Sequence, residues 1–121
     1  MKNALVIDDN RQTADALCTI LKILGFKPRA AYGPGPAMAI LTTEVPDMVF
    51  LDINMPGVTG FEILSYLRRE PRLATVPVFV VTSDDQPQTR QRAMDGGASE
   101  VIIKPVMADV LEVALKTANL M

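Results

Sequence analysis

The chain has 121 residues, of which 49% are apolar and 21% are charged, and its formal net charge is −2. This length allows one domain with a buried core that needs no disulfide or structural metal. The small net charge gives no overall attraction to nucleic acid or to an acidic membrane surface. Because the chain has no histidine, Ser-His and Cys-His catalysis are excluded, and only oxygen ligands remain for a metal site.

The amino-terminal segment MKNALVIDDN is not typical of a secretion signal, because its apolar core is short and a charge pair follows early. No apolar stretch approaches the ~18 residues that span a bilayer. The single cysteine, Cys18, lies in a helical pattern and is expected to be a small buried apolar residue. We therefore expect a cytoplasmic protein that neither enters a membrane nor binds nucleic acid directly.

The first half of the chain predicts two strands and two helices. Ala4–Ile7 is an unbroken apolar run, typical of a strand covered on both faces. The helical pattern that follows ends at Gly25, and its apolar face consists of Ala14, Leu17, Leu21 and Leu24. Pro28–Tyr32 predicts a strand at a sheet edge, because Pro28 cannot donate a backbone hydrogen bond. Residues 33–36 predict a turn, and Pro36–Leu41 predicts a short helix.

The second half continues the alternation. Further unbroken apolar runs predict strands at Met48–Leu51, Val78–Val81 and Val101–Ile103. A helical pattern with Phe61, Leu64 and Leu67 on one face follows Thr59, a candidate N-cap. The next helix is predicted from Pro87, which suits a first turn, to Gly96 and Gly97. The last helical pattern contains Leu111, Ala114, Leu115 and Ala118.

Strand and helix therefore alternate five times, with no repeat, low-complexity tract or linker. This order predicts an α/β fold in which a doubly wound, five-stranded parallel sheet lies between two layers of helices. Ligands of such sheets bind outside the carboxyl ends of the strands. The polar residues at those ends are therefore the candidate site.

Three carboxylates follow two of the predicted strands. Asp8 and Asp9 come directly after the first strand, and Asp52 ends the third. One interpretation is that Asp8 and Asp9 cap the following helix. Capping needs only one carboxylate, however, and crowded carboxylates oppose folding unless a cation offsets their charge. A metal site is therefore favoured, and Mg²⁺ fits best because it needs few carboxylates and shares oxygens with phosphate.

Asp52 is also a candidate nucleophile, because an aspartate carboxylate can attack phosphorus and form an acyl phosphate. Thr82 and Ser83 follow the fourth strand, where a hydroxyl and a backbone N–H can bind phosphoryl oxygens. The alternative for Thr82 is a cap or turn residue. Lys104 follows the fifth strand and precedes Pro105, and a cis bond there would direct the ammonium over the sheet edge. The alternative for Lys104 is a solvated surface lysine.

Four fragments, in this order, resemble those of a response-regulator receiver domain, the phosphoacceptor of two-component signalling: IDDN, PDMVFLDINMPGVTGFE, PVFVVTS and GGASEVIIKP. The resemblance extends over nearly the whole chain. It implies a CheY-like, flavodoxin-like (βα)5 fold and a single receiver domain over residues 1–121.

The resemblance implies that a sensor histidine kinase or a phosphotransfer protein phosphorylates Asp52, and that the receiver catalyses only its own phosphorylation and dephosphorylation. Asp9, Asp52 and the backbone carbonyl of Asn54 would ligate Mg²⁺, with Asp8 acting mainly through water. Thr82 would be the switch hydroxyl, and Lys104 would pair with the phosphoryl group. A downstream effector protein or output domain would respond.

Two positions depart from the family pattern. Val101 stands where receivers usually carry a tyrosine or phenylalanine that moves with the threonine, and Val106 replaces a common phenylalanine. The charge pattern that one transcription-factor subfamily uses for dimerisation is absent from the last helix, so a monomer or a different dimer is expected. The output surface is expected on the last two helices and the strand between them, with Met94, Val101 and Met107 exposed or in the core.

Two other functions are compatible with these residues. A Mg²⁺-dependent aspartyl phosphatase, resembling the haloacid-dehalogenase group, would also use an aspartate nucleophile. Its acidic pair would be two residues apart, whereas Asp8 and Asp9 are adjacent. A phosphorylation-independent interaction domain would have kept the fold and lost the switch, which Val101 favours and the intact acidic set does not.

Overall fold

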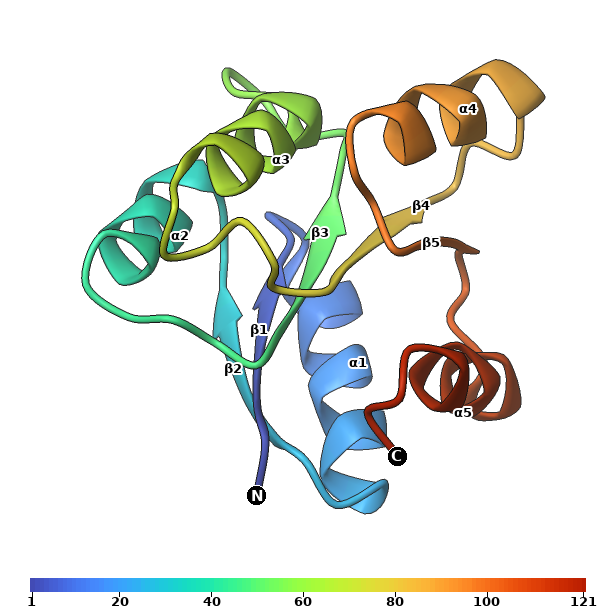
Figure 1. Ribbon diagram of the computed structural model, residues 1–121. Coiled ribbons are helices and arrows are strands. Elements are labelled where there is room, and N and C mark those ends of the chain that lie inside the picture. Colours follow the sequence, from blue (N-terminus) through green and yellow to red (C-terminus); the bar gives the residue numbers. More distant parts are fainter.

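The computed structural model describes residues 1–121 as five strands and five helices that alternate along the chain. The elements are β1 (Asn3–Ile7), α1 (Arg11–Ile23), β2 (Lys27–Ala31), α2 (Pro34–Leu41), β3 (Met48–Asp52), α3 (Gly60–Arg69), β4 (Val78–Thr82), α4 (Pro87–Asp95), β5 (Glu100–Ile103) and α5 (Ala108–Thr117). All neighbouring strands are parallel, in the order β2-β1-β3-β4-β5. The predicted doubly wound sheet is confirmed (Figure 1).

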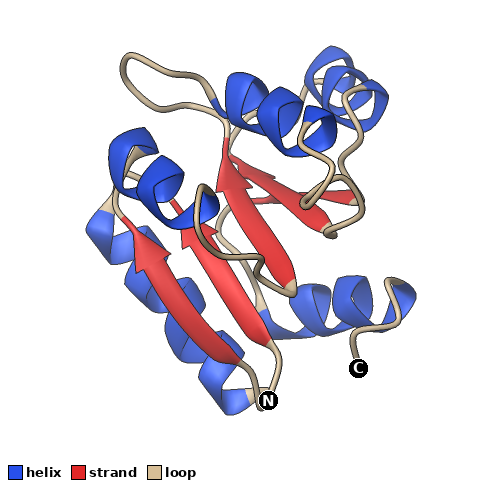
Figure 2. Ribbon diagram, turned by 60° about the vertical axis from the view of Figure 1, so that its left-hand side comes forward, coloured by secondary structure: helices blue, strands red, loops and turns tan.

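Helices cover both faces of the sheet, as Figure 2 shows. One apolar cluster joins the sheet to α2, α3 and α4 through residues that include Leu41, Leu64 and Ala93. A second cluster joins the other face to α1 and α5 through residues that include Leu21 and Leu115. Burial of these two faces is the main stabilising contribution to the three layers.

The burial of each strand follows its place in the sheet. Every residue of β3 and β4 is buried, as unbroken apolar runs predict for central strands. The strand β2 contains Pro28 and lies at one edge, as predicted. The strand β5 forms the other edge, so Ile103 is 43% exposed although its run is fully apolar.

The structure differs from the sequence predictions at two places. The helix α2 begins at Pro34, so residues 33–36 include the first turn of a helix, with Gly33 as its N-cap at φ 129°. Thr59 occupies the N-cap of α3, as predicted, although its side chain makes no capping bond. Cys18 is half-buried because it lies beside the apolar face of α1, and this burial, followed by the nearby Asp15 carboxylate, raises the pKa of its thiol.

Other terminal signals are confirmed. Gly25 follows α1 at φ 96°, Pro87 opens α4, and Gly97 follows α4 at φ 100°. The peptide bond between Lys104 and Pro105 is cis. None of the helices has both the length and the apolar character required to cross a bilayer.

Candidate functional site

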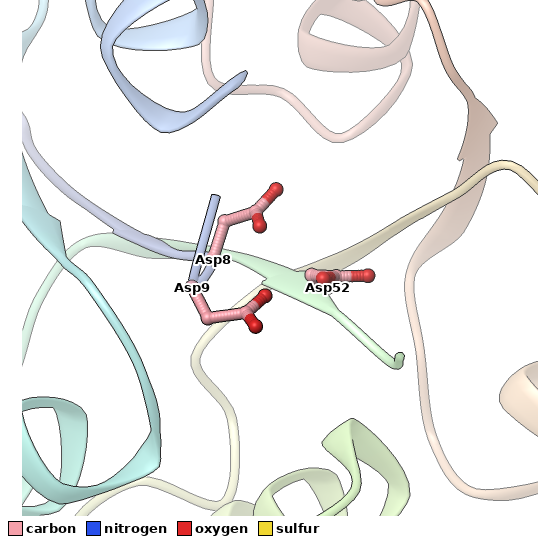
Figure 3. A group of neighbouring side chains, drawn as sticks. All are labelled: Asp8, Asp9 and Asp52. Atoms are coloured by element: carbon pink, nitrogen blue, oxygen red, sulfur yellow. The ribbon is translucent and has the colours of Figure 1, made fainter. Parts of the chain in front are cut away.

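Three carboxylates meet at the carboxyl ends of β1 and β3. These strands are neighbours, with Ile7 paired to Leu51, so Asp8 and Asp9 come close to Asp52. One oxygen from each carboxylate lies within 4.8 Å of the others. Figure 3 shows the Asp8 and Asp9 carboxylates directed toward the side on which Asp52 lies. Asp8 and Asp52 are 3% and 5% exposed, whereas Asp9 is on the surface.

The capping interpretation of Asp8 and Asp9 is wrong, because a different residue caps α1. Asn10 occupies the N-cap, and its Oδ1 accepts a hydrogen bond of 3.0 Å from the backbone N–H of Thr13. Asp8 Oδ1 accepts from the Asn10 backbone N–H at 2.9 Å, which holds the turn between β1 and α1. The acidic pair is therefore not needed to cap the helix.

Lys104 brings one positive charge to these carboxylates. Its Nζ lies 2.9 Å from Asp8 Oδ2 and 3.7 Å from Asp52 Oδ1, and its side chain is 18% exposed. The Lys104 backbone N–H donates to the Thr82 carbonyl at 2.8 Å, which fixes the chain beside the end of β4. Lys104 thus lies beside the acidic cluster with its side chain largely buried, and the solvated surface interpretation is wrong.

The Asp52 carboxyl is hard to ionise in this arrangement. Its pKa is raised from 3.8 to about 6, and burial is the main cause. The hydrogen bond from the Asn54 backbone N–H, 3.1 Å from Oδ1, limits this rise. The neighbouring Asp8 carboxylate contributes to the raised pKa of Asp52, and Lys104 opposes it. One ammonium therefore faces three carboxylates, and a further cation would relieve their repulsion. The donors are all oxygens, which suits a hard divalent cation.

An open hollow of about 390 Å³ lies over these groups. It is lined by Asp8, Asp9, Asn10, Asp52, Asn54, Ser83 and Lys104. All seven are polar, so the hollow can accept a charged group. One of them, Asn10, was not predicted to be a site residue, although it directly follows Asp9.

Thr82 does not line this hollow. Its side chain is fully buried, and its Oγ1 accepts from Asn54 Nδ2 at 3.3 Å and from the Asp84 backbone N–H at 3.0 Å. Asn54 therefore connects Thr82 to the hollow, because it lines the hollow and donates to the hydroxyl. The part played by Asp84 was not predicted, since nothing in its sequence neighbourhood marks it.

Val101 belongs to the core and not to the exposed output surface. It is 8% exposed and belongs to the same apolar cluster as Ala93 of α4. Met94 and Met107 are 36% and 57% exposed, so they remain candidates for such a surface.

The family model of the response regulator receiver domain matches residues 4–116. The chain belongs to this family. Membership confirms the resemblance carried by the four sequence fragments and places the chain among the receiver domains of two-component signalling.

Curated relatives of different lengths match this receiver domain. Protein PilH of Pseudomonas aeruginosa is 32% identical over 119 residues, which cover 98% of this chain and 96% of PilH. Protein RcaC of Microchaete diplosiphon is 32% identical over 102 residues, which cover 84% of this chain but 16% of RcaC. The chain thus spans almost all of one relative and about a sixth of the other.

Solved structures support the same fold. The chemotaxis protein CheY4 of Vibrio cholerae superposes with a TM-score of 0.89 at 25% sequence identity, covering 97% of this chain and 98% of CheY4. The doubly wound, flavodoxin-like architecture of the receiver family is thereby confirmed.

Proposed function

We propose that residues 1–121 form one receiver domain that accepts a phosphoryl group on Asp52. The donor would be a sensor histidine kinase or a phosphotransfer protein, and a downstream effector or output domain would respond. The observation that carries the proposal is the position of Asp52: a buried carboxylate at the end of β3, beside two other carboxylates and Lys104, facing a polar hollow. The compartment that we propose is the cytoplasm.

The residues around Asp52 fit a bound Mg²⁺. We propose that Asp8, Asp9, Asp52 and the backbone carbonyl of Asn54 hold the ion, with Asp8 acting mainly through water. Their oxygen-only donor set and their uncompensated negative charge support this assignment. When bound, the metal offsets negative charge on the carboxylates and on the phosphoryl oxygens.

Asn54, Asp52 and Lys104 have separate roles in the proposed phosphoryl transfer. The Asn54 backbone N–H orients the Asp52 carboxylate through Oδ1. Asp52 attacks phosphorus, an oxygen–phosphorus bond forms, and the bond from phosphorus to the donor breaks with its electron pair leaving on the donor. Lys104 then pairs with a phosphoryl oxygen, which removes its ammonium from Asp8. In this proposal the domain catalyses only its own phosphorylation and dephosphorylation.

Incubation with acetyl phosphate and Mg²⁺, followed by intact-mass measurement, tests the proposal. The wild-type protein should gain one hydroxylamine-sensitive phosphoryl group, and Asp52→Asn or removal of Mg²⁺ by EDTA should abolish the gain. Asp85→Asn, at an exposed loop position, is the matched control and should be modified as the wild type is. A wild-type protein without an adduct would contradict the proposal, and steady turnover of unrelated phosphomonoesters would indicate a phosphatase instead.

A further inference from the structure

Thr82 is connected to the helix that follows it by hydrogen bonds through Asp84. The Asp84 backbone N–H donates to Thr82 Oγ1 at 3.0 Å. The Asp84 carboxylate accepts in turn, through Oδ1 from the Gln86 backbone N–H at 2.9 Å and through Oδ2 from Thr89 Oγ1 at 2.6 Å. Gln86 is the N-cap of α4 and Thr89 lies in its first turn. The bonds therefore run from the end of β4 to the start of α4. Figure 1 shows the two elements and the short segment that joins them.

We propose that Asp84 is a positioning residue that transmits the position of the Thr82 hydroxyl to the first turn of α4. Its use as a switch rests on the proposed function, because a phosphoryl group on Asp52 would be the group that attracts Thr82. The side chain of the N-cap residue Gln86 makes no capping bond. The Asp84 carboxylate is therefore the side chain that fixes this end of the helix to the turn after β4.

Thr82 cannot reach the hollow without changing these bonds. Its side chain is fully buried, and two donors, Asn54 Nδ2 and the Asp84 N–H, already converge on Oγ1. A hydroxyl oxygen has two acceptor sites, so both are in use. A movement toward Asp52 would leave the Asp84 N–H without its acceptor unless the turn moves too. Because the Asp84 carboxylate holds Gln86 and Thr89, a moving turn displaces the start of α4.

Val101 stands where receiver domains usually carry a tyrosine or phenylalanine that moves with the threonine. The hydrogen bonds through Asp84 therefore have no such movable ring beside them. Val101 is buried under α4 in the same cluster as Ala93, and its branched Cβ restricts χ1. At position 101, therefore, no large side chain can swing beneath α4 when Thr82 moves. The bonds from Thr89 and then Gln86 also lower the pKa of Asp84, which keeps this carboxylate in the accepting form.

Amide hydrogen exchange without metal or phosphodonor tests the connection itself. Thr82→Val removes the acceptor of the Asp84 N–H and keeps the side-chain shape. It should speed exchange by about tenfold at Asp84 and measurably at Gln86, Thr89 and Arg90. In an Asp84→Ala background the effect of Thr82→Val at Thr89 and Arg90 should vanish, whereas Asp84→Asn, which retains an acceptor oxygen, should preserve it. Thr117→Val, a matched change in α5, should leave these amides unchanged.

Amide hydrogen exchange is then measured after addition of Mg²⁺ and beryllofluoride, a mimic of an acyl phosphate. This experiment tests whether the connection through Asp84 acts as a switch. Exchange at Gln86, Thr89 and Arg90 should change in the wild type and in Asp84→Asn, but not in Asp84→Ala, while all three bind beryllofluoride at Asp52. If α4 responds equally in Asp84→Ala, or if Thr82→Val leaves the α4 amides unchanged, the proposal is overturned. If the wild type fails to bind beryllofluoride, the proposed function fails. The exchange data without ligand then still show whether Asp84 connects Thr82 to the first turn of α4.

Discussion

Lys104 pairs more closely with Asp8 than with Asp52, although Asp52 is the proposed phosphoacceptor. Its Nζ lies 2.9 Å from Asp8 Oδ2 and 3.7 Å from Asp52 Oδ1, across 96 positions of sequence in the first case. The ammonium therefore offsets charge at the end of β1 and at the end of β3 together. Lys104 thereby connects the ends of β1 and β3 to β5, the last strand in the sequence and an edge of the sheet.

Lys104→Ala should destabilise the metal-free protein. The substitution leaves the Asp8 carboxylate, 3% exposed, without its cation, and loss of one partner of a largely buried pair costs about 2–3 kcal/mol. Urea unfolding near neutral pH measures the loss. Lys116→Ala removes an exposed lysine paired with Glu112 at 3.2 Å and should cost less than about 1 kcal/mol. Equal losses in the two variants would show that the Lys104 pair contributes nothing beyond a surface pair.

Asp52→Asn should stabilise the metal-free protein at neutral pH. The pKa of Asp52 is raised from 3.8 to about 6 on folding, so the folded state favours the protonated form. The contribution of protonated Asp52 to the free energy of unfolding is therefore fully present below about pH 4, and it is lost as the pH rises through about 6. The amide of Asn does not ionise, so the variant avoids this loss and should gain about 1–3 kcal/mol above pH 7.

Urea unfolding of both proteins in EDTA, at about pH 4 and about pH 7.5, measures this difference. The gain of Asp52→Asn should be present at the higher pH and small at the lower one. Addition of Mg²⁺ should reduce the gain, because the carboxylate has the greater affinity for the ion. A gain that is the same at both pH values would mean that ionisation of Asp52 is not its cause.

The sequence was sufficient to predict the fold and the convergence of the acidic residues. Apolar runs and helical faces are local patterns, and the carboxyl ends of parallel strands meet at one edge whatever the strand order. Asp8, Asp9 and Asp52 could therefore be grouped without coordinates. The place of β5 at an edge could not be predicted, because its apolar run is the same as that of a central strand.

The finer relationships in the site depend on tertiary distances that no local pattern contains. Asn10 competes with Asp8 and Asp9 for the helix cap, and only the backbone geometry shows that Asn10 occupies it. Thr82 was placed correctly at the end of β4, but its burial behind Asn54 depends on how β3 and β4 are paired. Asp84 carried no signal, because an aspartate in a loop before a proline-initiated helix is common.

Mg²⁺ should stabilise the wild-type protein, and Asp9→Asn should remove at least about half of that effect. A ligand that binds only the folded state at 100 times its Kd adds about 2.7 kcal/mol to the free energy of unfolding. Asp9 is exposed, so its replacement should change the metal-free stability by less than about 0.5 kcal/mol. Loss of one carboxylate ligand should weaken Mg²⁺ binding by at least about tenfold, or about 1.4 kcal/mol.

Thermal unfolding with Mg²⁺ and with EDTA measures this difference, and Asp85→Asn is the matched control. The control removes an exposed carboxylate outside the cluster and should retain the full Mg²⁺ effect. If both variants retain it, Asp9 is not a ligand; if the wild type shows none, the cluster does not bind the ion.

Gly60→Ala should destabilise the protein although alanine is the better helix former. Gly60 is the first residue of α3, and a Cβ there would meet the Asp52 carbonyl oxygen and would lie 2.5 Å from Ile53 Cα. Both are backbone atoms, so α3 or the end of β3 must shift, at a cost of about 2–3 kcal/mol. Because the shift displaces the backbone of Asp52, phosphorylation of Asp52 by acetyl phosphate should also slow.

Gly35→Ala is the matched control, because Gly35 lies in the first turn of α2 with nothing within 4 Å of an added Cβ. Helix propensity favours alanine over glycine by about 1 kcal/mol, whereas the following Pro36 disfavours helical backbone at a residue with a Cβ. The two effects oppose each other, so the stability of this variant should stay within about 1 kcal/mol of the wild type. Urea unfolding of the two variants separates the effect of helix propensity from the effect of the clash at residue 60. A stable Gly60→Ala protein with unchanged phosphorylation would mean that α3 can move away from Asp52 at no cost, and the close approach of the two would then have no part in forming the site.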